Sequence, residues 1–388
     1  MSVQWVVKTT KLCNLRCRYC YEFPWLGDSA RMSATQLDAF FRHVAEAYAD
    51  RPETMDFVWH GGEPLLLGTA FYDQIFALQE KHLAPAGVAW ENSIQTNLTR
   101  LDDELIALLR RFANIGVSID VFGDLRVDAA GNKSQPKVLE HMQQLLDANV
   151  NFGCITVLSR KNYKRLREIF TFFTDLHLSF RLLPIYRTGF LHQHDDFGLS
   201  EKEILESLLQ AVDLWFDMDS QIQMRPIQDY VLNVVRKYSH RANRMGHYSK
   251  KQSETLFIVN TDGRLFSNAD AYADGYSYGS IFETSLTGLL ASAGYMRSRE
   301  ERLGRMKTAC EGCVHFGACS GFYMGEATPE QRFLDETGKL RCGIVKPLMD
   351  AIERRLIADG VLDPVRGEVD TAWLNSVDEV SSSCAAEF

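Results

Sequence analysis

The segment Lys11–Glu22, which reads K-L-C-N-L-R-C-R-Y-C-Y-E, is the one around which the rest of the chain is organised. It places Cys13, Cys17 and Cys20 in a C-x3-C-x2-C pattern directly after a strand-like run. Three thiolates in so short a loop can surround one face of an iron-sulfur cluster and leave one iron without a protein ligand. The alternative is a zinc site that lacks its fourth ligand.

Length and composition limit the class of protein. The chain has 388 residues, enough for two domains, and 46% of them are hydrophobic, which suffices for a buried core. A net charge of -9 argues against a general nucleic-acid binder. We find neither an export signal nor a membrane-spanning run, so we expect a cytoplasmic protein without a membrane partner. Seven of the nine cysteines fall into two groups, which fits metal ligation better than disulfides.

The first half of the chain alternates strand-like and helix-like segments, which predicts an α/β fold with a parallel sheet and crossover helices. Ser33 and Gln36 predict a capping box at the start of the first helix. After Ser200 the pattern predicts helices without intervening strands. The predicted strands are Gln4–Lys8, Met55–His60, Val88–Thr96, Ile115–Asp120, Phe152–Leu158 and Ser179–Tyr186.

Polar residues follow several of these strands. Gly61, Gly62 and Glu63 come directly after the second one. Glycine lets the backbone come close to a ligand, and a carboxylate can accept hydrogen bonds from an ammonium group. A simple turn would have the same sequence, so both interpretations stay open here. Asn97 and Ser118 end the next two strands, where they could contact a ligand or cap the strand.

A second group of cysteines lies near the carboxyl end. Asp262-Gly263 predicts a tight hairpin turn. After it come C-x2-C-x5-C and a distant fourth cysteine, and these thiolates could hold zinc or a 4Fe-4S cluster. Cys154 is predicted to be a buried apolar thiol, and Cys384 a free thiol in a tail that we expect to be disordered beyond Ser376. The group comprises Cys310, Cys313, Cys319 and Cys342.

The stretch C-N-L-R-C-R-Y-C-Y resembles the signature of radical S-adenosylmethionine (radical SAM) enzymes. The resemblance implies a partial (β/α)6 TIM-like barrel with active groups at the carboxyl ends of the strands. It also implies a 4Fe-4S cluster on Cys13, Cys17 and Cys20, with SAM on the fourth iron and a 5′-deoxyadenosyl radical that abstracts a substrate hydrogen. An electron donor such as flavodoxin or ferredoxin is implied as well.

The same resemblance extends to the residues after the strands. Gly61, Gly62 and Glu63 are similar to the family motif that holds the SAM amino group. Asn97 and Ser118 lie in segments similar to those of sulfatase maturases, in which the serine contacts the SAM ribose. Arg126 could bind a carboxylate or be a solvated loop residue, and its role is left open.

The second cysteine group and the hairpin resemble a SPASM or twitch domain, which carries auxiliary 4Fe-4S clusters. A full SPASM domain has further cysteines at positions where this chain has Asn268 and Tyr323. We therefore expect one auxiliary cluster. Ala269 stands where the family has a catalytic aspartate, with Asp270 one residue later, so the catalytic residues stay unknown.

These observations predict four segments and one main function. We expect a radical SAM enzyme that abstracts hydrogen from an unactivated C-H of a peptide or protein, giving an oxidative modification or crosslink in a ribosomally made peptide. The alternatives are a dehydrogenase or epimerase of a small molecule such as a sugar or aminocyclitol, and a non-catalytic iron-sulfur or zinc protein. The segments are a partial barrel (1–199), a helical connector (200–252), an auxiliary-cluster domain (253–362) and an acidic tail (363–388).

Overall fold

Two compact units make up the structure, a computed structural model. The first unit comprises residues 1–118, 124–152 and 250–301, and the second comprises 119–123, 153–249 and 302–388. Predictions on Asn268, Ala269, Asp270, Tyr323 and Cys384 lie outside the described residues. The predicted segment boundaries stay a prediction. The described residues are 2–185, 195–217, 222–238, 254–267, 274–319, 321, 324 and 332–383, with the backbone alone for 378–383.

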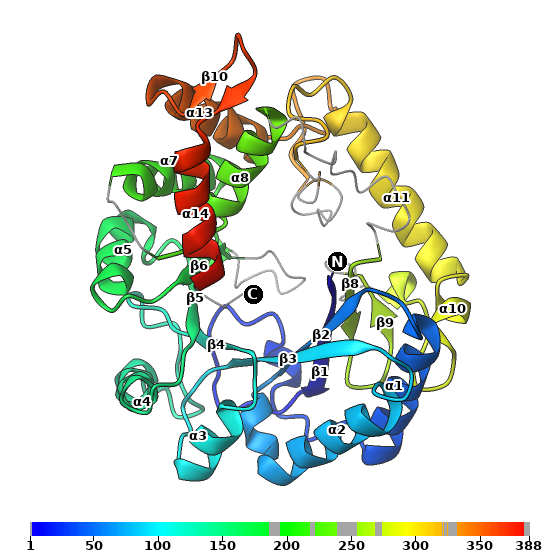
Figure 1. The fold of residues 1–388 in the computed structure, drawn as a ribbon. Coiled ribbons are helices and arrows are strands. Elements are labelled where there is room, and N and C mark those ends of the chain that lie inside the picture. Colours follow the sequence, from blue (N-terminus) through cyan, green and yellow to red (C-terminus); the bar gives the residue numbers. More distant parts are fainter. Residues whose placement is uncertain are drawn as a thin grey trace. The chain divides into compact units, whose positions relative to one another are not determined.

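The first unit is built on six strands in the order β4-β3-β2-β1-β8-β9 (Figure 1). All neighbouring pairs are parallel except the β8–β9 hairpin. Helices connect the consecutive parallel strands, which confirms the predicted α/β class. The elements are β1 (Ser2–Thr10), η1 (Phe23–Trp25), α1 (Ala34–Tyr48), β2 (Thr54–Gly61), η2 (Pro64–Leu67), α2 (Thr69–His82), β3 (Ala89–Thr96), α3 (Asp103–Leu109), β4 (Asn114–Ser118), α4 (Gln135–Asp147), β8 (Leu256–Val259), β9 (Leu265–Phe266), η5 (Asp274–Tyr276) and α10 (Leu286–Leu289).

Helix α1 shows how local sequence sets an element of this unit. The Ser33 side chain accepts the Gln36 backbone N–H at 3.3 Å, and the Gln36 side chain accepts the Ser33 N–H at 2.8 Å. This is the predicted capping box. Farther along the helix, Phe40 meets Trp5 of β1 edge-on, with 5.5 Å between ring centroids. Such a pair contributes about 0.5–1.5 kcal/mol beyond its buried area, so the ring contact helps to hold α1 on the sheet.

The second unit contains three parallel strands in the order β7-β6-β5. Helix α13 packs against α7 and α8. No helix in the described part of the chain is long and apolar enough to cross a membrane. The elements are β5 (Gly153–Leu158), η3 (Tyr163–Arg165), α5 (Leu166–Asp175), β6 (Phe180–Pro184), α7 (Glu201–Asp217), β7 (Met224–Arg225), α8 (Ile227–Tyr238), α13 (Val345–Ala358), β10 (Leu362–Asp363), β11 (Glu368–Val369) and α14 (Thr371–Ser383), and helix α11 (Ala293–Cys310) ends in this unit.

The prediction of helices without strands after Ser200 is wrong, because β7 lies between α7 and α8. Strand β7 pairs in parallel with β6, so that Met224 is opposite Phe180 and Arg225 opposite Arg181. A strand of two residues is too short to show an alternating pattern in the sequence. Only its pairing with β6 identifies it.

The prediction of a disordered tail beyond Ser376 is also wrong for the described residues, because helix α14 continues to Ser383. The Asp370 carboxylate accepts the backbone N–H of Ala372 at 2.9 Å and so satisfies a free donor of the first turn. The Trp373 ring meets Trp215 of α7 edge-on at 6.4 Å. The cap and the ring contact together stabilise a helix that its serine-rich sequence disfavours.

Candidate functional site

Two chain segments hold the cysteine loop of the first unit by backbone hydrogen bonds. The Cys13 N–H donates to the Leu26 carbonyl at 3.1 Å. In the second contact, the Arg16 N–H donates to the Val127 carbonyl at 2.6 Å. Cys13 and Cys17 are buried, and Cys20 is half-buried. The loop is therefore a fixed structure in which two of three thiols are shielded from solvent.

Arg126, whose role the sequence leaves open, also contacts this loop. Its Nη1 donates to the Tyr19 hydroxyl at 3.0 Å. Tyr19 immediately precedes Cys20, so the contact fixes the loop beside its third thiol. Leu15 of the loop also forms an antiparallel bridge with Asp128. No short-range pattern could reveal the partnership, since the two segments are far apart in the sequence.

Burial controls the protonation of the thiols. It raises the pKa of Cys13 to about 11 and that of Cys20 to about 12. The charge of Cys17 adds to both increases, which places its sulfur near the other two. The Leu15 N–H (3.4 Å) and the Asn97 side-chain amide (3.7 Å) both donate hydrogen bonds to Cys13 Sγ. Metal binding would release thiol protons here, and N–H···S contacts of this kind tune iron-sulfur clusters.

Gly61 and Gly62 let the turn after β2 pass directly against the cysteine loop. The Gly62 N–H donates to the Thr10 carbonyl at 2.8 Å. A Cβ at Gly61 would lie 2.2 Å from the Thr10 oxygen, and one at Gly62 would lie 2.3 Å from the Leu12 oxygen. The φ of Gly61, 130°, is one that other residues rarely adopt. The close approach of two chain segments accounts for both glycines, and their contact with a ligand stays a prediction.

Glu63 is buried and accepts three hydrogen bonds from the protein. Its Oε1 accepts the Leu65 N–H at 3.0 Å and the Thr96 hydroxyl at 2.7 Å, and its Oε2 accepts the Asn97 N–H at 2.6 Å. Burial raises the pKa of Glu63, and these hydrogen bonds oppose the increase. An ionised carboxylate has about four acceptor positions, so about one is left for a ligand.

The other two predicted cofactor contacts also have protein partners. The Asn97 side chain donates to Asn14 Oδ1 at 3.0 Å and accepts the Thr99 hydroxyl at 2.6 Å. Ser118 accepts the Gln95 side-chain amide at 2.8 Å. The structure thus brings Asn97 to the cysteine loop and Ser118 to the end of β4. Their contact with SAM stays a prediction.

An ion pair that the sequence did not indicate lies beside the cysteine loop. Lys8 and Glu22 form a buried ion pair with 2.6 Å between Nζ and Oε1. Burial, together with the positive charge of Lys8, lowers the pKa of His60 to about 4. His60 Nδ1 accepts the Gly61 N–H at 2.7 Å, so the ring proton is assigned to Nε2. His60 is therefore a neutral hydrogen-bond donor at the end of β2.

The second cysteine group lies in the second unit, between the end of α11 and the start of α13. The Cys313 N–H donates to the Cys310 carbonyl at 3.0 Å. Burial raises the pKa of Cys310 to about 12, and the charges of Cys342, Cys319 and Cys313 add to the increase. These electrostatic effects show that the four sulfur atoms lie near one another.

The spacing of the sulfur atoms differs from that of a zinc site. Sulfur atoms bound to one tetrahedral zinc ion lie about 3.8 Å apart. Within the described ranges, no three cysteine sulfur atoms lie within 4.8 Å of one another, whereas donor atoms of His315, Asp350 and Glu353 do. In an iron-sulfur cluster each thiolate binds a different iron. Neither cysteine group, within the described residues, therefore has the sulfur spacing of a single bound zinc ion.

Similar sequences place the first of these cysteine groups inside a known domain. Residues 7–173 match the Radical SAM superfamily. The serine-type anaerobic sulfatase-maturating enzyme of Klebsiella pneumoniae is 25% identical over 342 residues, which cover 80% of this chain and 83% of that enzyme. The cysteine-type enzyme of Clostridium novyi is 22% identical over 319 residues, which cover 79% and 83%.

Similar solved structures share the fold of this chain. The structure of histidine-tagged anSMEcpe with bound AdoMet has a TM-score of 0.71 at 19% identity and covers 92% of this chain and 98% of its own. Streptococcus suis SuiB bound to S-adenosylmethionine has a TM-score of 0.59 at 13% identity and covers 87% and 77%. Likeness at these identities confirms the predicted fold. Residues 7–173 therefore form a radical SAM domain, and anaerobic sulfatase-maturating enzymes are among the homologues of this chain.

Proposed function

We propose that this protein is a radical SAM enzyme that oxidatively modifies a peptide or protein substrate. The observation that carries the proposal is the loop of Cys13, Cys17 and Cys20, which is packed against the Gly61–Glu63 turn inside a radical SAM domain. When bound to such a loop, a 4Fe-4S cluster supplies the electron that converts SAM to methionine and a 5′-deoxyadenosyl radical, which removes hydrogen from an unactivated C-H.

The chain's own residues would bind and orient SAM. The last acceptor position of Glu63 suits the SAM ammonium group, because a buried carboxylate forms a strong charge-assisted hydrogen bond. Asn97 and Ser118 lie at the carboxyl ends of the next two strands, where ribose hydroxyls would be within reach.

Four of the cysteines in the second unit would hold one auxiliary 4Fe-4S cluster, namely Cys310, Cys313, Cys319 and Cys342. Among the described residues, no three of the cysteine sulfur atoms lie within 4.8 Å of one another, which supports a cluster instead of zinc. Four protein ligands leave no open iron, so substrate would not bind to it directly. We assign this cluster the role of accepting an electron from the product radical, which would yield a crosslink, a double bond or an oxidised side chain.

The substrate class comes from the homologues. The relatives are named for sulfatase maturation. Structures of anSMEcpe contain a Cp18Cys peptide, and SuiB is bound to its precursor peptide SuiA. We extend only the class, a peptide or protein, to this chain. A reducing partner such as flavodoxin or ferredoxin and a cytoplasmic location are parts of the same proposal.

The decisive experiment is anaerobic incubation of the reconstituted protein with SAM and dithionite. We expect release of 5′-deoxyadenosine by the wild-type protein and none by Cys17→Ala, because removal of one of three thiolates prevents assembly of the cluster with an open iron. Cys154→Ala is the matched control, since this buried thiol belongs to neither cysteine group. Release of 5′-deoxyadenosine by Cys17→Ala would refute the proposal.

A further inference from the structure

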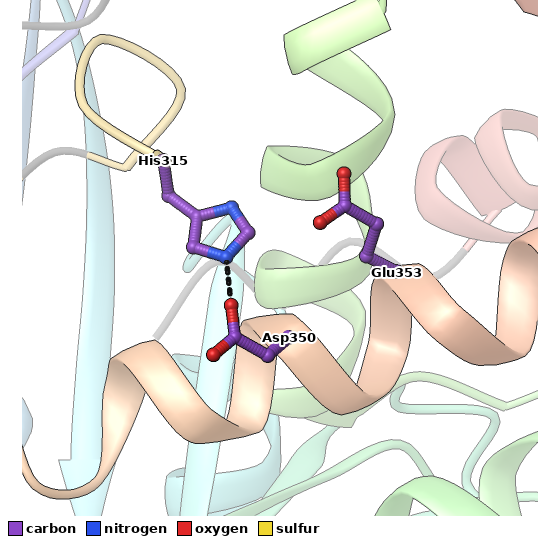
Figure 2. A group of neighbouring side chains, drawn as sticks. All are labelled: His315, Asp350 and Glu353. Carbon is purple, nitrogen blue, oxygen red and sulfur yellow. Dashed lines mark hydrogen bonds and ion pairs between the residues drawn. The ribbon is translucent and has the colours of Figure 1, made fainter. Parts of the chain in front are cut away.

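We propose that His315 and Asp350 are positioning residues for the auxiliary site. Their hydrogen bond ties the loop that carries Cys313 and Cys319 to the helix that follows Cys342. Figure 2 shows the His315 ring pointing from its loop to Asp350 on α13, with 2.7 Å between Nε2 and Oδ1. The inference rests on the proposed auxiliary site and adds what holds its ligands in place.

On the loop side, His315 sets the path of the chain between two ligands. Its carbonyl accepts the N–H of Ala318 at 3.1 Å and of Cys319 at 2.8 Å. Its side chain is 1% exposed, whereas its neighbours Val314 and Phe316 are 59% and 51% exposed. His315 is thus the buried member of this short segment. Its ring is the anchor through which the loop is fixed to another element.

On the helix side, Asp350 is fixed relative to Cys342. Helix α13 begins at Val345, and the backbone N–H groups of Val345 and Lys346 hydrogen-bond to the Cys342 sulfur, which opposes the increase in its pKa that burial causes. A movement of α13 would therefore move Cys342. Because Asp350 lies on the same helix, its bond to His315 sets the distance between Cys342 and the other ligands.

Asp350 also holds a positive charge beside the ligands. Its Oδ2 accepts from Lys346 Nζ at 2.7 Å. This hydrogen bond is the main cause of the raised pKa of Lys346, and Cys313 and Cys342 add to the increase. The ammonium group is therefore close to two of the four sulfur atoms. The Asp350 carboxylate thus orients both the loop that carries His315 and the ammonium group of Lys346.

The same residues could be taken for a metal site. Donor atoms of His315, Asp350 and Glu353 lie within 4.8 Å of one another, and His315 Nδ1 has no hydrogen-bond partner among the described residues. However, Asp350 is paired with Lys346, and Glu353 is paired with Lys237 at 2.6 Å. A divalent cation would have to displace both lysines. The charges therefore favour a structural bond over a cation site.

The test uses full-length protein in which Cys13, Cys17 and Cys20 are replaced by alanine. Metal that is still bound after anaerobic reconstitution then reports on the auxiliary site alone, whether that metal is iron or zinc. We expect His315→Leu and Asp350→Leu to bind at least fivefold less metal and to lose the electron paramagnetic resonance signal of the reduced cluster. His315→Gln keeps an N–H donor and Asp350→Asn keeps an oxygen acceptor, so both should retain the metal.

Glu353→Gln separates the positioning bond from a cation site. It removes a charge from the supposed cation site without touching the His315–Asp350 bond, so we expect it to keep the metal and the signal. Full metal binding by both leucine variants would overturn the inference. Equal losses in His315→Gln and His315→Leu, or a loss in Glu353→Gln, would also overturn it. If the wild-type protein fails to release 5′-deoxyadenosine, the proposed function is refuted. The amounts of metal bound by the variants relative to their parent would not change.

Discussion

The backbone N–H of Asn97 donates to Oε2 of Glu63 at 2.6 Å and thereby joins the end of β3 to the turn after β2. The side chain of the same Asn97 points its amide at Cys13 Sγ, 3.7 Å away. The turn and the cysteine loop are therefore one hydrogen-bonded assembly. A substitution at Glu63 must act on both the turn and the loop.

Glu63→Gln should weaken SAM binding and destabilise the protein. The ammonium contact that we propose is worth roughly 1.5–3 kcal/mol, which corresponds to about one to two decades in Kd. Glutamine also presents an NH2 group to backbone donors, which should lower the free energy of unfolding by about 1–3 kcal/mol. Equilibrium SAM binding and urea unfolding measure the two effects.

Thr96→Val is the matched control for that variant. It removes one hydroxyl donor to Glu63 Oε1 and leaves the carboxylate in place. We expect a loss of stability with SAM affinity close to that of the wild type. If Glu63→Gln and wild type bind SAM equally, the Gly61–Glu63 turn has only a structural role.

Reconstituted wild-type protein should contain roughly eight irons and eight sulfides per chain, because we propose that seven of its cysteines serve two 4Fe-4S clusters. Two auxiliary clusters would raise each number to about twelve, for which the chain lacks thiolates. Iron and acid-labile sulfide assays make the comparison. Iron near the higher value, or tightly bound zinc at the second site, would contradict our assignment.

Cys313→Ala should separate SAM cleavage from product formation. The variant keeps the loop of Cys13, Cys17 and Cys20, so we expect it to release 5′-deoxyadenosine. It should lose most product turnover, because the acceptor for the electron of the product radical is missing. Parallel assays of 5′-deoxyadenosine and of modified substrate test this, with Cys154→Ala as the control. Full product formation by Cys313→Ala would exclude the electron-acceptor role.

His60 should make the stability of the metal-free protein depend on pH. Its pKa falls from 6.5 to about 4 on folding, so the unfolded chain binds more protons between these values. Stability is then fully present above pH 6.5 and declines as the pH falls towards 4, by at most about 3 kcal/mol. His60→Asn keeps an acceptor for the Gly61 N–H but cannot titrate. Urea unfolding of both proteins should show a decline in wild type that is smaller in the variant, and parallel curves would contradict the prediction.

The sequence by itself determined the features that depend on neighbours along the chain. The spacing of Cys13, Cys17 and Cys20 by itself indicates that the three thiolates bind one metal centre. The box of Ser33 and Gln36 formed as predicted, because its hydrogen bonds join residues one helical turn apart. Six of the parallel strands were recognised from their apolar runs. Each of these signals is complete within one short segment.

Only the tertiary structure decided which of these segments meet. The need for glycine at Gly61 and Gly62 arises from the carbonyls of a different strand and its loop, and the burial of Glu63 from residues after β3. Strand β8 is far from β1 in the sequence, yet the two strands pair in parallel. His315 finds Asp350 on a helix that begins beyond Cys342. Long-range contacts of this kind depend on how the whole chain packs, and no local pattern encodes them.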